Sequence, residues 1–431
     1  MPDRSGRPHP RPVVTTHCAI TAAALANCLG TDSRTVLDRA FAGVDAFSPA
    51  GAFHEFPFPT MLGVMPGIEE HRGLRAAERP PADGDPLDCI STRLAMAALP
   101  SVRQLRPAVH AAVERWGARR VAYVFASSTG GLDETERALA PDPRLPLASA
   151  CYHYADHGVD ATSQAIARSF GALGVCLAIS TACSSSFHAL ASALRLIDRG
   201  LADAAVVGGA DSLCRTTVFG FHGLGLTAPT ATRPFARERA GITIGEGSAY
   251  ALVERDAPDT RRRALAWIAG IGAASDAFHH TSPHPDGLGG QLCMRQALDR
   301  AGMSPDAIDC VSAHGTGTKL NDAAEAAAVH QVFGRRVPLT ATKSLTGHTL
   351  GSAGLTALVL AVESLRRQAI PATLRAAPLD EALGVDVVDR LTAAELRHVL
   401  VNAFGFGGSN VSVVVSRPDL RPDLRTTTRP S

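Results

Sequence analysis

This sequence is poor in aromatic residues and contains no long apolar run. Phe, Trp and Tyr together make up 5% of its 431 residues. The best apolar helix candidate, residues 355–365, is interrupted by Glu363 and is too short to cross a bilayer. Residues 1–12 are rich in Pro and Arg and have no apolar core, so we expect no secretory signal there. We therefore expect neither a membrane protein nor a secreted one.

Closely spaced cysteines are missing as well. None of the nine cysteines belongs to a Cys-x-x-Cys pair, and their number is odd. This pattern argues against a zinc site and against a framework of disulfides, so we expect no metal and a reducing cytoplasm. The cysteines stand at positions 18, 28, 89, 151, 176, 183, 214, 293 and 310.

The sequence has no excess of charge of either sign. Lys and Arg number 42, Asp and Glu number 41, and the formal net charge is +1. Nothing in this balance attracts nucleic acid, so no nucleic-acid partner is expected. Hydrophobic residues make up 45% and charged residues 19%, which is typical of a well-packed enzyme. The length allows two or three domains, or one large fused pair.

Apolar runs typical of strands alternate with helical patterns in the first half. Residues 13–22 are predicted to form a strand that runs into a helix through Leu25, and residues 173–179 a buried strand followed by a helix up to Gly200. Helices are also predicted at 89–99, at 109–116 and within 149–173, and strands at 120–126 and 204–209. Such alternation indicates an α/β fold with helices covering the sheet.

The same rhythm returns after a charged connector at 254–263. One strand is predicted directly before the connector, at 249–253. After the connector, strands are predicted at 264–274, 308–313, 337–342 and as a Gly-interrupted pair at 399–415, and helices at 291–301, 323–333 and 351–367. We therefore expect two related α/β halves, residues 13–257 and 258–416. The two ends, 1–12 and 417–431, are predicted to be disordered.

The central motif is a cysteine turn at residues 180–186 (Ser-Thr-Ala-Cys-Ser-Ser-Ser), between a strand and a helix. Cys183 thus lies at the first turn of a helix, where free N–H groups meet the positive end of the helix dipole. A thiol at such a place ionises more easily, and the thiolate is the nucleophile. Taken alone, however, the turn more simply indicates a small buried Cys that only packs.

Two histidine motifs follow strand ends in the second half. Residues 313–318 (Ala-His-Gly-Thr-Gly-Thr) place His314 at the rim of a sheet, where the sites of α/β proteins gather. Residues 342–348 (Thr-Lys-Ser-Leu-Thr-Gly-His) could bring Lys343 and His348 to one point. Each motif alone is equally consistent with a structural role, either as a His at the edge of the core or as a solvated Lys in a capping turn.

Two glycine-containing motifs complete the set. Residues 402–410 (Asn-Ala-Phe-Gly-Phe-Gly-Gly-Ser-Asn) permit unusual backbone angles and close approach, although a bulged strand would explain them too. Residues 233–235 (Arg-Pro-Phe), with the glycines between 241 and 247, indicate structure more than chemistry.

In this order the motifs make the sequence resemble the β-ketoacyl-acyl carrier protein synthases, the decarboxylating condensing enzymes of the thiolase superfamily. The resemblance covers about residues 13–416 and is strongest from Leu173 onward. The first half departs from the family pattern at residues 15–17 (Thr-Thr-His) and at 126–128, where Ala-Ser-Ser replaces Gly-Ser-Gly. The resemblance implies a five-layered α/β/α/β/α fold of the thiolase type, built from two related halves.

The implied reaction is a decarboxylative Claisen condensation that gives a 3-ketoacyl-carrier, in fatty acid, polyketide or polyene biosynthesis. By resemblance, Cys183 would hold the acyl group as the covalent nucleophile. His314 and His348 would stabilise the enolate left by loss of CO2, and Lys343 would tune their surroundings. The backbone N–H groups of Cys183 and Phe406 would form the oxyanion hole.

The resemblance also implies supporting and gating residues. Glu325 would be an internal partner of Lys343. The others are Asp322 as a further support, Phe406 with Gly405 and Gly407 as a gate of the acyl pocket, Phe278 and His279 as a partner gate, and Thr129 in the acyl tunnel near a dimer interface.

The resemblance implies no cofactor, because the substrates are carried as thioesters on the phosphopantetheine of an acyl carrier protein. The chain would form a homodimer, or a heterodimer with a related ketosynthase or chain-length factor. A non-catalytic chain-length subunit is the main alternative, but such subunits usually lack the nucleophile, and Cys183, His314 and His348 are all present here. A thiolase would carry a second Cys in the C-terminal glycine motif, and residues 402–410 contain none.

Overall fold

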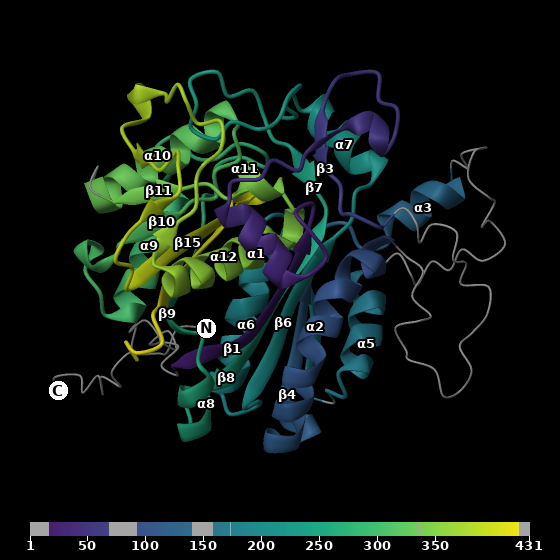
Figure 1. Ribbon diagram of the computed structural model, residues 1–431, viewed down its shortest axis with the longest axis vertical. Coiled ribbons are helices and arrows are strands. Elements are labelled where there is room, and N and C mark those ends of the chain that lie inside the picture. The colour runs from purple at the N-terminus through teal and green to yellow at the C-terminus, as the bar shows by residue number, and fades with distance from the viewer. Residues whose placement is uncertain (1–16, 69–92, 140–157, 173, 335–336, 422–431) are drawn as a thin grey trace, which may run out of the picture.

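The protein is organised around one mixed β-sheet that runs through the whole molecule (Figure 1). The computed structural model describes residues 17–68, 93–139, 158–172, 174–334 and 337–421. Within these residues the strands follow the order β13–β11–β10–β15–β16–β9–β1–β8–β6–β4–β5. Their bounds are β1 Cys18–Asn27, β4 Val121–Ala126, β5 Cys176–Ile179, β6 Ala204–Asp211, β8 Gly247–Arg255, β9 Ala266–Ser275, β10 Cys310–Ser312, β11 Pro338–Thr340, β13 Asp386–Val387, β15 His398–Gly405 and β16 Ser409–Ser416.

The sheet has two parts, one from each half of the chain, which join over a short stretch. At the joint, residues 18–20 of β1 pair antiparallel with residues 266–268 of β9. In the first part, β4 runs parallel to β5 and β6, and β8 runs antiparallel to β6 and β1. In the second part, β10 runs parallel to β11 and β15, and β16 runs antiparallel to β15 and β9. Parallel neighbours direct their carboxyl ends to one edge, so the turns after them are collected there.

Helices cover both parts of the sheet and also separate them, which gives the five layers (Figure 1). Two helices lie between the parts, and their buried Phe187 and Leu358 belong to the same core cluster as Val413 of β16. One outer layer packs Val109 and Phe170 against the first part, and the other packs Val329 against the second part. The bounds are α6 Ser185–Asp198 and α12 Ala353–Arg367 in the middle, α2 Arg93–Trp116 and α5 Val159–Ser169 outside the first part, and α9 Leu288–Ala301 and α10 Lys319–Phe333 outside the second.

Shorter elements complete the described chain. A small sheet has the order β2–β3–β7, and β12 pairs with β14. The bounds are α1 Ser33–Phe41, β2 Ser48–Pro49, β3 Met61–Gly63, α3 Leu132–Leu139, α7 Arg215–Gly223, β7 Ile244–Gly245, α8 Pro258–Arg263, α11 Lys343–Thr346, η8 Leu350–Ser352, β12 Ala369–Ile370, β14 Thr392–Ala393 and η10 Phe406–Gly408.

The first strand is longer than predicted, and the helix expected through Leu25 is absent. β1 continues to Asn27 and pairs with β8 along its length. Alanine-rich segments favour helix by propensity, but here Leu25 is buried in the sheet and the backbone is held by its neighbour. The first helix, α1, begins instead at Ser33, where the side chain of Asp32 accepts a hydrogen bond from the Thr35 N–H.

One continuous helix replaces the two that were predicted on either side of a proline-containing gap. α2 passes through Pro100 and Pro107 without ending. Its side chains Val102, Leu105 and Val109 are all buried in the core against the first part of the sheet. Packing of this apolar face therefore outweighs the loss of the two proline N–H groups. The predicted residues 89–92 lie outside the described chain.

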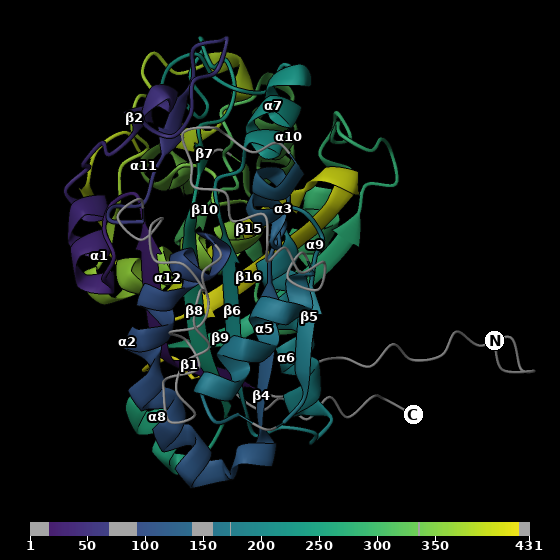
Figure 2. The ribbon, with the colours of Figure 1, turned by 90° about the vertical axis from the view of Figure 1, so that its right-hand side faces the viewer.

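β5 is the outermost strand of the sheet and is not buried as predicted (Figure 2). It pairs with β4 on one side and has no described strand on the other. Val175 is 36% exposed and Leu177 is 38% exposed. An apolar run therefore indicated a strand correctly but gave the wrong burial, because the sequence does not tell a central strand from an edge.

Residues 417–421, which were predicted to be disordered, pack against the rest of the chain. The indole Nε1 of Trp267 donates to the Pro418 carbonyl at 2.9 Å, and Arg421 pairs with Asp256. The connector predicted at 254–263 is largely the short helix α8. The expected disorder of residues 1–12 and 422–431 concerns residues outside the described chain.

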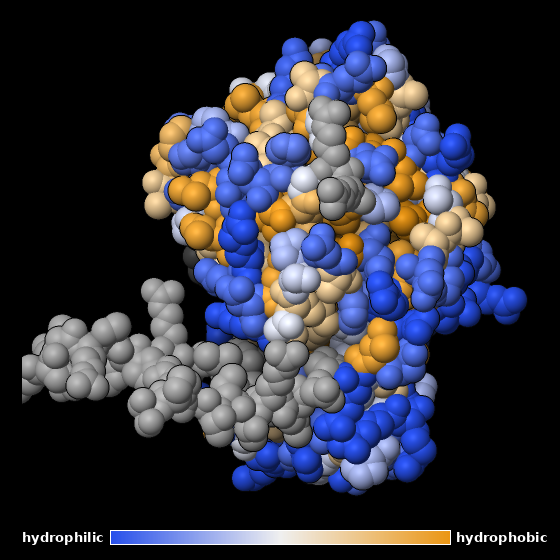
Figure 3. All heavy atoms as spheres, turned by 90° about the vertical axis from the view of Figure 1, so that its left-hand side faces the viewer, coloured by the Kyte–Doolittle hydropathy of each residue, from blue (hydrophilic) through white to orange (hydrophobic). Residues whose placement is uncertain are grey.

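The outer face formed by the second half carries hydrophilic and hydrophobic side chains interspersed (Figure 3). Leu288 and Leu292 of α9 and Leu320 of α10, all in the second half, are exposed apolar side chains. Among the described residues, the helices are either too short or too polar to cross a bilayer.

Candidate active site

Cys183 lies on the tight turn between β5 and α6, as predicted. Ala182, directly before it, has a φ of 51°, a left-handed conformation that is rare for a residue other than glycine. The turn is held by the Thr181 N–H, which donates to Ser185 Oγ at 2.7 Å, and by Ser184 Oγ, which donates to the Thr181 carbonyl at 2.9 Å. This strained backbone places the Cys183 thiol at the N-terminus of α6, where it is only 6% exposed.

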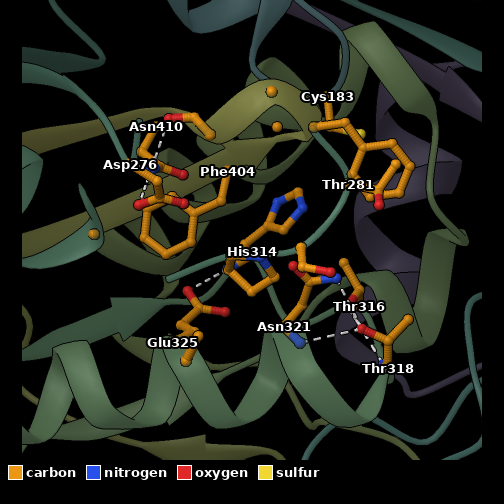
Figure 4. Close-up of a pocket in the computed structure, with 18 of the residues that line it drawn as sticks. Cys183, Asp276, Thr281, His314, Thr316, Thr318, Asn321, Glu325, Phe404 and Asn410 are labelled. Atoms are coloured by element: carbon orange, nitrogen blue, oxygen red, sulfur yellow. Dashed lines mark hydrogen bonds between the residues drawn. The ribbon is translucent and has the colours of Figure 1, made fainter. Parts of the chain in front are cut away.

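The two predicted histidines meet Cys183 from the other half of the chain. Figure 4 shows Cys183 and His314 in the same pocket. The Cys183 Sγ and ring nitrogens of His314 and His348 all lie within 4.8 Å of one another. The two imidazole rings are 5.4 Å apart between centroids and nearly perpendicular, at 86°. His314 follows β10 and His348 follows α11, so the turns after separate elements converge on one thiol.

His314 is fixed by Lys343 and Glu325. The Lys343 Nζ lies 3.1 Å from His314 Nδ1 and donates to the His314 carbonyl at 2.5 Å. The carboxylate of Glu325 accepts from the N–H groups of His314 at 2.7 Å and Gly315 at 2.8 Å. Asn402 Nδ2 donates to the same carboxylate at 3.0 Å. A protonated amine can only donate, so Nδ1 of His314 accepts and the ring proton sits on Nε2.

His348 has the same tautomer for a different reason. The backbone N–H of Leu350 donates to His348 Nδ1 at 3.0 Å. A backbone N–H cannot accept, so the neutral imidazole carries its proton on Nε2. Leu350 reaches this position with a φ of 51°, a second strained backbone in the site. Lys343 and Leu350 therefore occupy the Nδ1 atoms of the two histidines, and each ring has an N–H donor at Nε2.

Burial controls the ionisation of the whole cluster. It raises the pKa of the Cys183 thiol to about 11, and the nearby Lys343 opposes that rise. It lowers the pKa of Lys343 to about 8, against the attraction of Glu325. Burial and the charge of Lys343 hold the pKa values of His314 and His348 well below the usual range, so both rings are neutral at neutral pH.

Two backbone N–H groups point toward the thiol. Those of Phe406 and Cys183 itself lower the pKa of the Cys183 thiol, because each can donate to the thiolate. Phe406 begins η10, between β15 and β16, and Gly405 before it packs tightly, since a Cβ there would lie 3.1 Å from Ser184 Oγ. The β15–β16 turn of the second part of the sheet thus contacts the turn that carries Cys183.

The Cys-His-His group has the elements of a metal-ligand set, but the contacts of its two histidine rings differ from those of metal ligands. A histidine that ligates a metal through Nε2 usually donates its Nδ1–H to a neighbouring acceptor. Here Lys343 and the Leu350 N–H occupy the two Nδ1 atoms as donors. The arrangement therefore suits N–H donation into the site and does not suit coordination of a metal.

The site opens into a cavity with two kinds of wall. Cys183, His314 and His348 line it together with the hydroxyl-bearing Thr316 and Thr318. The apolar part of the lining is contributed by Phe221, Leu226, Ile242 and Phe404. A long, partly polar molecule that ends near the thiol would fit such a lining.

The glycine loop, residues 405–408, forms another wall of this cavity. The ring of Phe406 lies on Phe221 of α7, with 5.5 Å between centroids and 33° between planes. Gly407 and Gly408 have φ values of 79° and 72°, which favour glycine. The Gly408 carbonyl accepts from the Asp276 N–H at 2.9 Å, so the loop rests on the neighbouring 276–283 loop.

Three predicted site residues lie elsewhere. Phe278 is 55% exposed and His279 is also exposed, and neither lines the cavity; Asp276, Thr281, Ser282 and Pro283 of the same loop do. Thr129 is buried against Asp211, to which both its N–H and its hydroxyl donate at 2.8 Å. None of Phe278, His279 and Thr129 lines the cavity in the described chain, and their expected roles, as a partner gate and in an acyl tunnel near a dimer interface, stay predictions.

Asp322 lies behind the His314 turn and not in the cavity. Its carboxylate accepts from the N–H groups of Phe235 at 2.8 Å and Gly317 at 3.0 Å, and Arg239 lies 4.0 Å away. Burial raises the pKa of Asp322 to about 7. The residue therefore shapes the turn that carries His314.

Sequence reasoning missed three residues of the site. Phe404 lines the cavity beside His314, at 5.9 Å between ring centroids, and Phe221 faces Phe406. Asp211 ends the buried strand β6 and contacts the turns around the site. A signal was available for Asp211, because a carboxylate directly after an apolar strand lies at the sheet edge where sites gather.

Comparison with known proteins identifies relatives over most of the chain. Residues 81–258 match the N-terminal domain of β-ketoacyl synthase, and residues 265–377 match its C-terminal domain. The 3-oxoacyl-[acyl-carrier-protein] synthase 2 of Vibrio cholerae is 36% identical over 57% of this chain and 63% of its own length. The corresponding protein of Vibrio harveyi is 32% identical over 70% of this chain and 76% of its own.

A solved structure agrees over nearly the full length. One chain in the complex of a ketosynthase with its chain length factor from Xenorhabdus doucetiae superposes with a TM-score of 0.83. The two chains are 33% identical, and the match covers 93% of this chain and 98% of the chain in that complex.

Proposed function

The chain belongs to the β-ketoacyl synthase family and is therefore a condensing acyltransferase, and we propose that it joins an acyl group to a malonyl unit in the cavity at Cys183. The malonyl unit loses CO2, and the product is a 3-ketoacyl thioester. The observation that carries this proposal is the meeting of Cys183, His314 and His348 within 4.8 Å in a cavity walled by the glycine loop.

In the first stage the acyl group moves to Cys183. The thiol attacks the carbonyl carbon of an acyl thioester, and the oxygen becomes an oxyanion held by the N–H groups of Cys183 and Phe406. The C–S bond to the carrier then breaks, and the departing thiolate takes the proton that Cys183 gave up. The N-terminus of α6, Lys343 and the two N–H groups favour the thiolate that burial disfavours.

In the second stage a malonyl thioester enters and loses its carboxylate as CO2. The electron pair of the broken C–C bond moves into the thioester, whose oxygen becomes an enolate. His314 and His348 meet this charge with two Nε2–H donors, which the Nδ1 contacts with Lys343 and Leu350 maintain. The enolate carbon attacks the acyl carbonyl on Cys183, and collapse of that intermediate breaks the C–S bond and releases the Cys183 thiolate, which takes one proton from solvent.

The substrates that suit this cavity are thioesters on a flexible polar arm. Thr316 and Thr318 offer hydroxyl groups along one wall, while Phe221, Leu226 and Ile242 offer apolar surface. Phosphopantetheine on an acyl carrier protein has amides for the first wall and delivers its thioester to the thiol. The acyl carrier protein is therefore the proposed partner, and the chain itself needs no further cofactor.

We also propose that the chain works as a dimer, with a second copy or a related ketosynthase subunit. The support is β5, which has no strand on its outer edge among the described residues and whose Leu177 is exposed. Residues 13–257 and 258–416 would act as the two related halves, the first giving Cys183 and the second giving the histidines.

The alternative function is a chain-length subunit without condensing activity. A related solved complex contains a chain length factor beside its ketosynthase. The complete set of Cys183, His314, His348 and Lys343, held by buried contacts, favours the active enzyme.

The decisive experiment is mass spectrometry of the intact protein after incubation with a panel of acyl-carrier thioesters. Acylation should add the mass of one acyl group, and digestion should locate it on Cys183. The Cys183→Ala variant should take up no acyl group and form no 3-ketoacyl product. Cys214→Ala is the matched control, because Cys214 is a buried thiol outside the cavity lining. A label on Cys214, or no label on any Cys while product forms, would contradict the proposal.

A further inference from the structure

Asp211 is a buried carboxylate that accepts hydrogen bonds from two segments close to the site. It ends β6 and has no exposed surface. Its Oδ1 accepts from Ser127 Oγ, the Ser128 N–H, the Thr129 N–H and Thr129 Oγ1, each at 2.8 Å. Its Oδ2 accepts from the Gly351 N–H at 2.6 Å. Both oxygens are thus occupied by donors from different parts of the chain.

The charge on Asp211 is met by dipoles and not by a cation. No Lys, Arg or His within the described ranges forms an ion pair with it. Consecutive N–H groups of a turn form a concave site for an anion, and Ser128 and Thr129 supply such a pair. Burial raises the pKa of Asp211, and the donors from Thr129, Ser127 and Ser128 oppose that rise. A buried carboxylate with this many donors is stabilised only while all of them stay in place.

Each contact of Asp211 leads to a different part of the site. The turn at 127–129 continues through Ser128 Oγ, which donates at 3.1 Å to the carbonyl of Ala182, the strained residue before Cys183. On the other side, Gly351 directly follows Leu350, whose N–H fixes the proton of His348. Leu350 holds its left-handed φ of 51° at a point where the next N–H is anchored on Asp211.

We propose that Asp211 is a positioning residue with two effects. It keeps the proton of the His348 ring on Nε2, and it holds the turn that carries Cys183 in a fixed position relative to His348. It acts through Gly351 and Leu350 on His348 and through Ser128 and Ala182 on Cys183. Its effect on the reaction rests on the proposed function, whereas its effect on the His348 tautomer does not.

We call the hydrogen bond between the Gly351 N–H and Asp211 the junction. Two substitutions disturb it, one on each side. Asp211→Asn keeps the shape, but its NH2 group must face either the Gly351 N–H or the donors of the 127–129 turn, so donor meets donor. Gly351→Ala leaves Asp211 intact, but its Cβ would lie 2.7 Å from Asp211 Oδ2 and 2.9 Å from Ser128 Oγ. Ser212→Ala is the control, because Ser212 is buried next to Asp211 and its Oγ has no hydrogen-bond partner among the described residues.

The experiment measures two quantities on the same folded samples. The first is malonyl-carrier decarboxylation, which should fall about 10- to 100-fold in kcat with little change in KM for Asp211→Asn and Gly351→Ala. The second is the 15N NMR signal of the His348 ring, assigned with His348→Ala. This signal should show a proton on Nε2 in the wild type and in Ser212→Ala, and a mixture of tautomers in the two junction variants.

The double variant adds a test of the shared junction. Because both substitutions break the same contact, the loss in Asp211→Asn/Gly351→Ala should match the larger single loss and not the product of the two. A folded Asp211→Asn or Gly351→Ala protein with the wild-type His348 signal would overturn the proposal, even if its melting temperature fell. If Asp211→Asn does not fold, Gly351→Ala decides the question by the same signal. If the wild type does not decarboxylate malonyl-carrier, the proposed function fails, but the tautomer comparison still stands.

Discussion

Among single residues, His314 and His348 differ from the usual picture of a catalytic base. Their Nδ1 atoms accept from Lys343 and Leu350, so their Nε2 atoms already carry protons. Such a ring gives a hydrogen bond to an oxyanion readily but has no free lone pair to remove a proton from Cys183. The two histidines therefore suit the enolate stage better than the acylation stage.

This distinction predicts a separation of the two stages. His314→Ala and His348→Ala should each reduce malonyl decarboxylation roughly 10²–10³-fold, the loss expected for one oxyanion donor. Transfer of an acyl group to Cys183 should fall far less, because its oxyanion is held by backbone N–H groups. Stopped assays of CO2 release and of acyl-enzyme mass, on the same samples, measure both. A variant that decarboxylates at the wild-type rate would show that its histidine has another role.

Lys343 gives a prediction about pH. Its pKa is lowered to about 8, so its charge is present below that value and is lost above it. The enolate loses a stabilising positive charge when Lys343 is neutral, so decarboxylation should decline as the pH rises through about 8.

The lysine can be observed directly. Lys319 and Lys343 are the two lysines of the sequence, so protein with 13C at the lysine Cε should give two signals. Lys343→Met assigns them, and the exposed Lys319 serves as the internal reference. A Lys343 signal that titrates at the ordinary lysine value of 10.5 would contradict the prediction.

At the scale of elements, the β15–β16 turn places two groups of Phe406, its backbone N–H and its ring, in different surroundings. The Phe406 N–H must stay close to the Cys183 thiol to stabilise the oxyanion, while the Phe406 ring packs on Phe221 in the wall of the cavity. A Cβ added at Gly407 would meet no atom within 4 Å, so the backbone there has room to move. A gate that opens by rotation at Gly407 could move the ring without removing the tight contact at Gly405.

If Phe406 is the gate, removal of its ring should change acyl loading more than stability. Phe406→Ala should alter the rate and order of acyl loading while the protein stays folded, and Phe221→Ala should reproduce the effect. Phe278→Ala is the matched control, since Phe278 is exposed and outside the cavity lining. Single-turnover acylation and thermal unfolding of the same samples measure both properties. A stability loss of roughly 3–5 kcal/mol with normal loading per folded molecule would show that Phe406 is only core packing.

Local patterns predicted the turns of the site but not the orientation of its more distant side chains. Cys183 and His314 could be placed because each follows a strand, and strand ends of one sheet share an edge. Nothing local shows that Thr129 turns toward Asp211 or that Phe278 turns toward solvent, because these orientations depend on partners far away in sequence. The misassignment of β1 has the same origin, since helix propensity at Leu25 loses to pairing with β8.

At the scale of the whole molecule, the exposed edge of β5 predicts association. Leu177→Arg would place a charge on this edge, and we expect it to convert a dimer into a monomer with little change in fold. Light scattering after size-exclusion chromatography measures the mass in solution. Leu391→Arg is the control, because Leu391 is equally apolar, 53% exposed and far along the chain from β5. A dimer that survives Leu177→Arg would place the interface elsewhere.

The site draws on positions from Cys183 to Phe406, and this spread matters while the protein is being made. During synthesis of the second half, the Cys183 thiol has neither imidazole nor the Phe406 N–H beside it. β15 pairs with β10, and β16, which is made last, then links β15 to β9, so the segment around Phe406 also completes the second part of the sheet. We therefore expect a chain that ends before Phe406 to lack one of the two N–H groups that favour the Cys183 thiolate, and so to react with acyl thioesters more slowly than the complete chain.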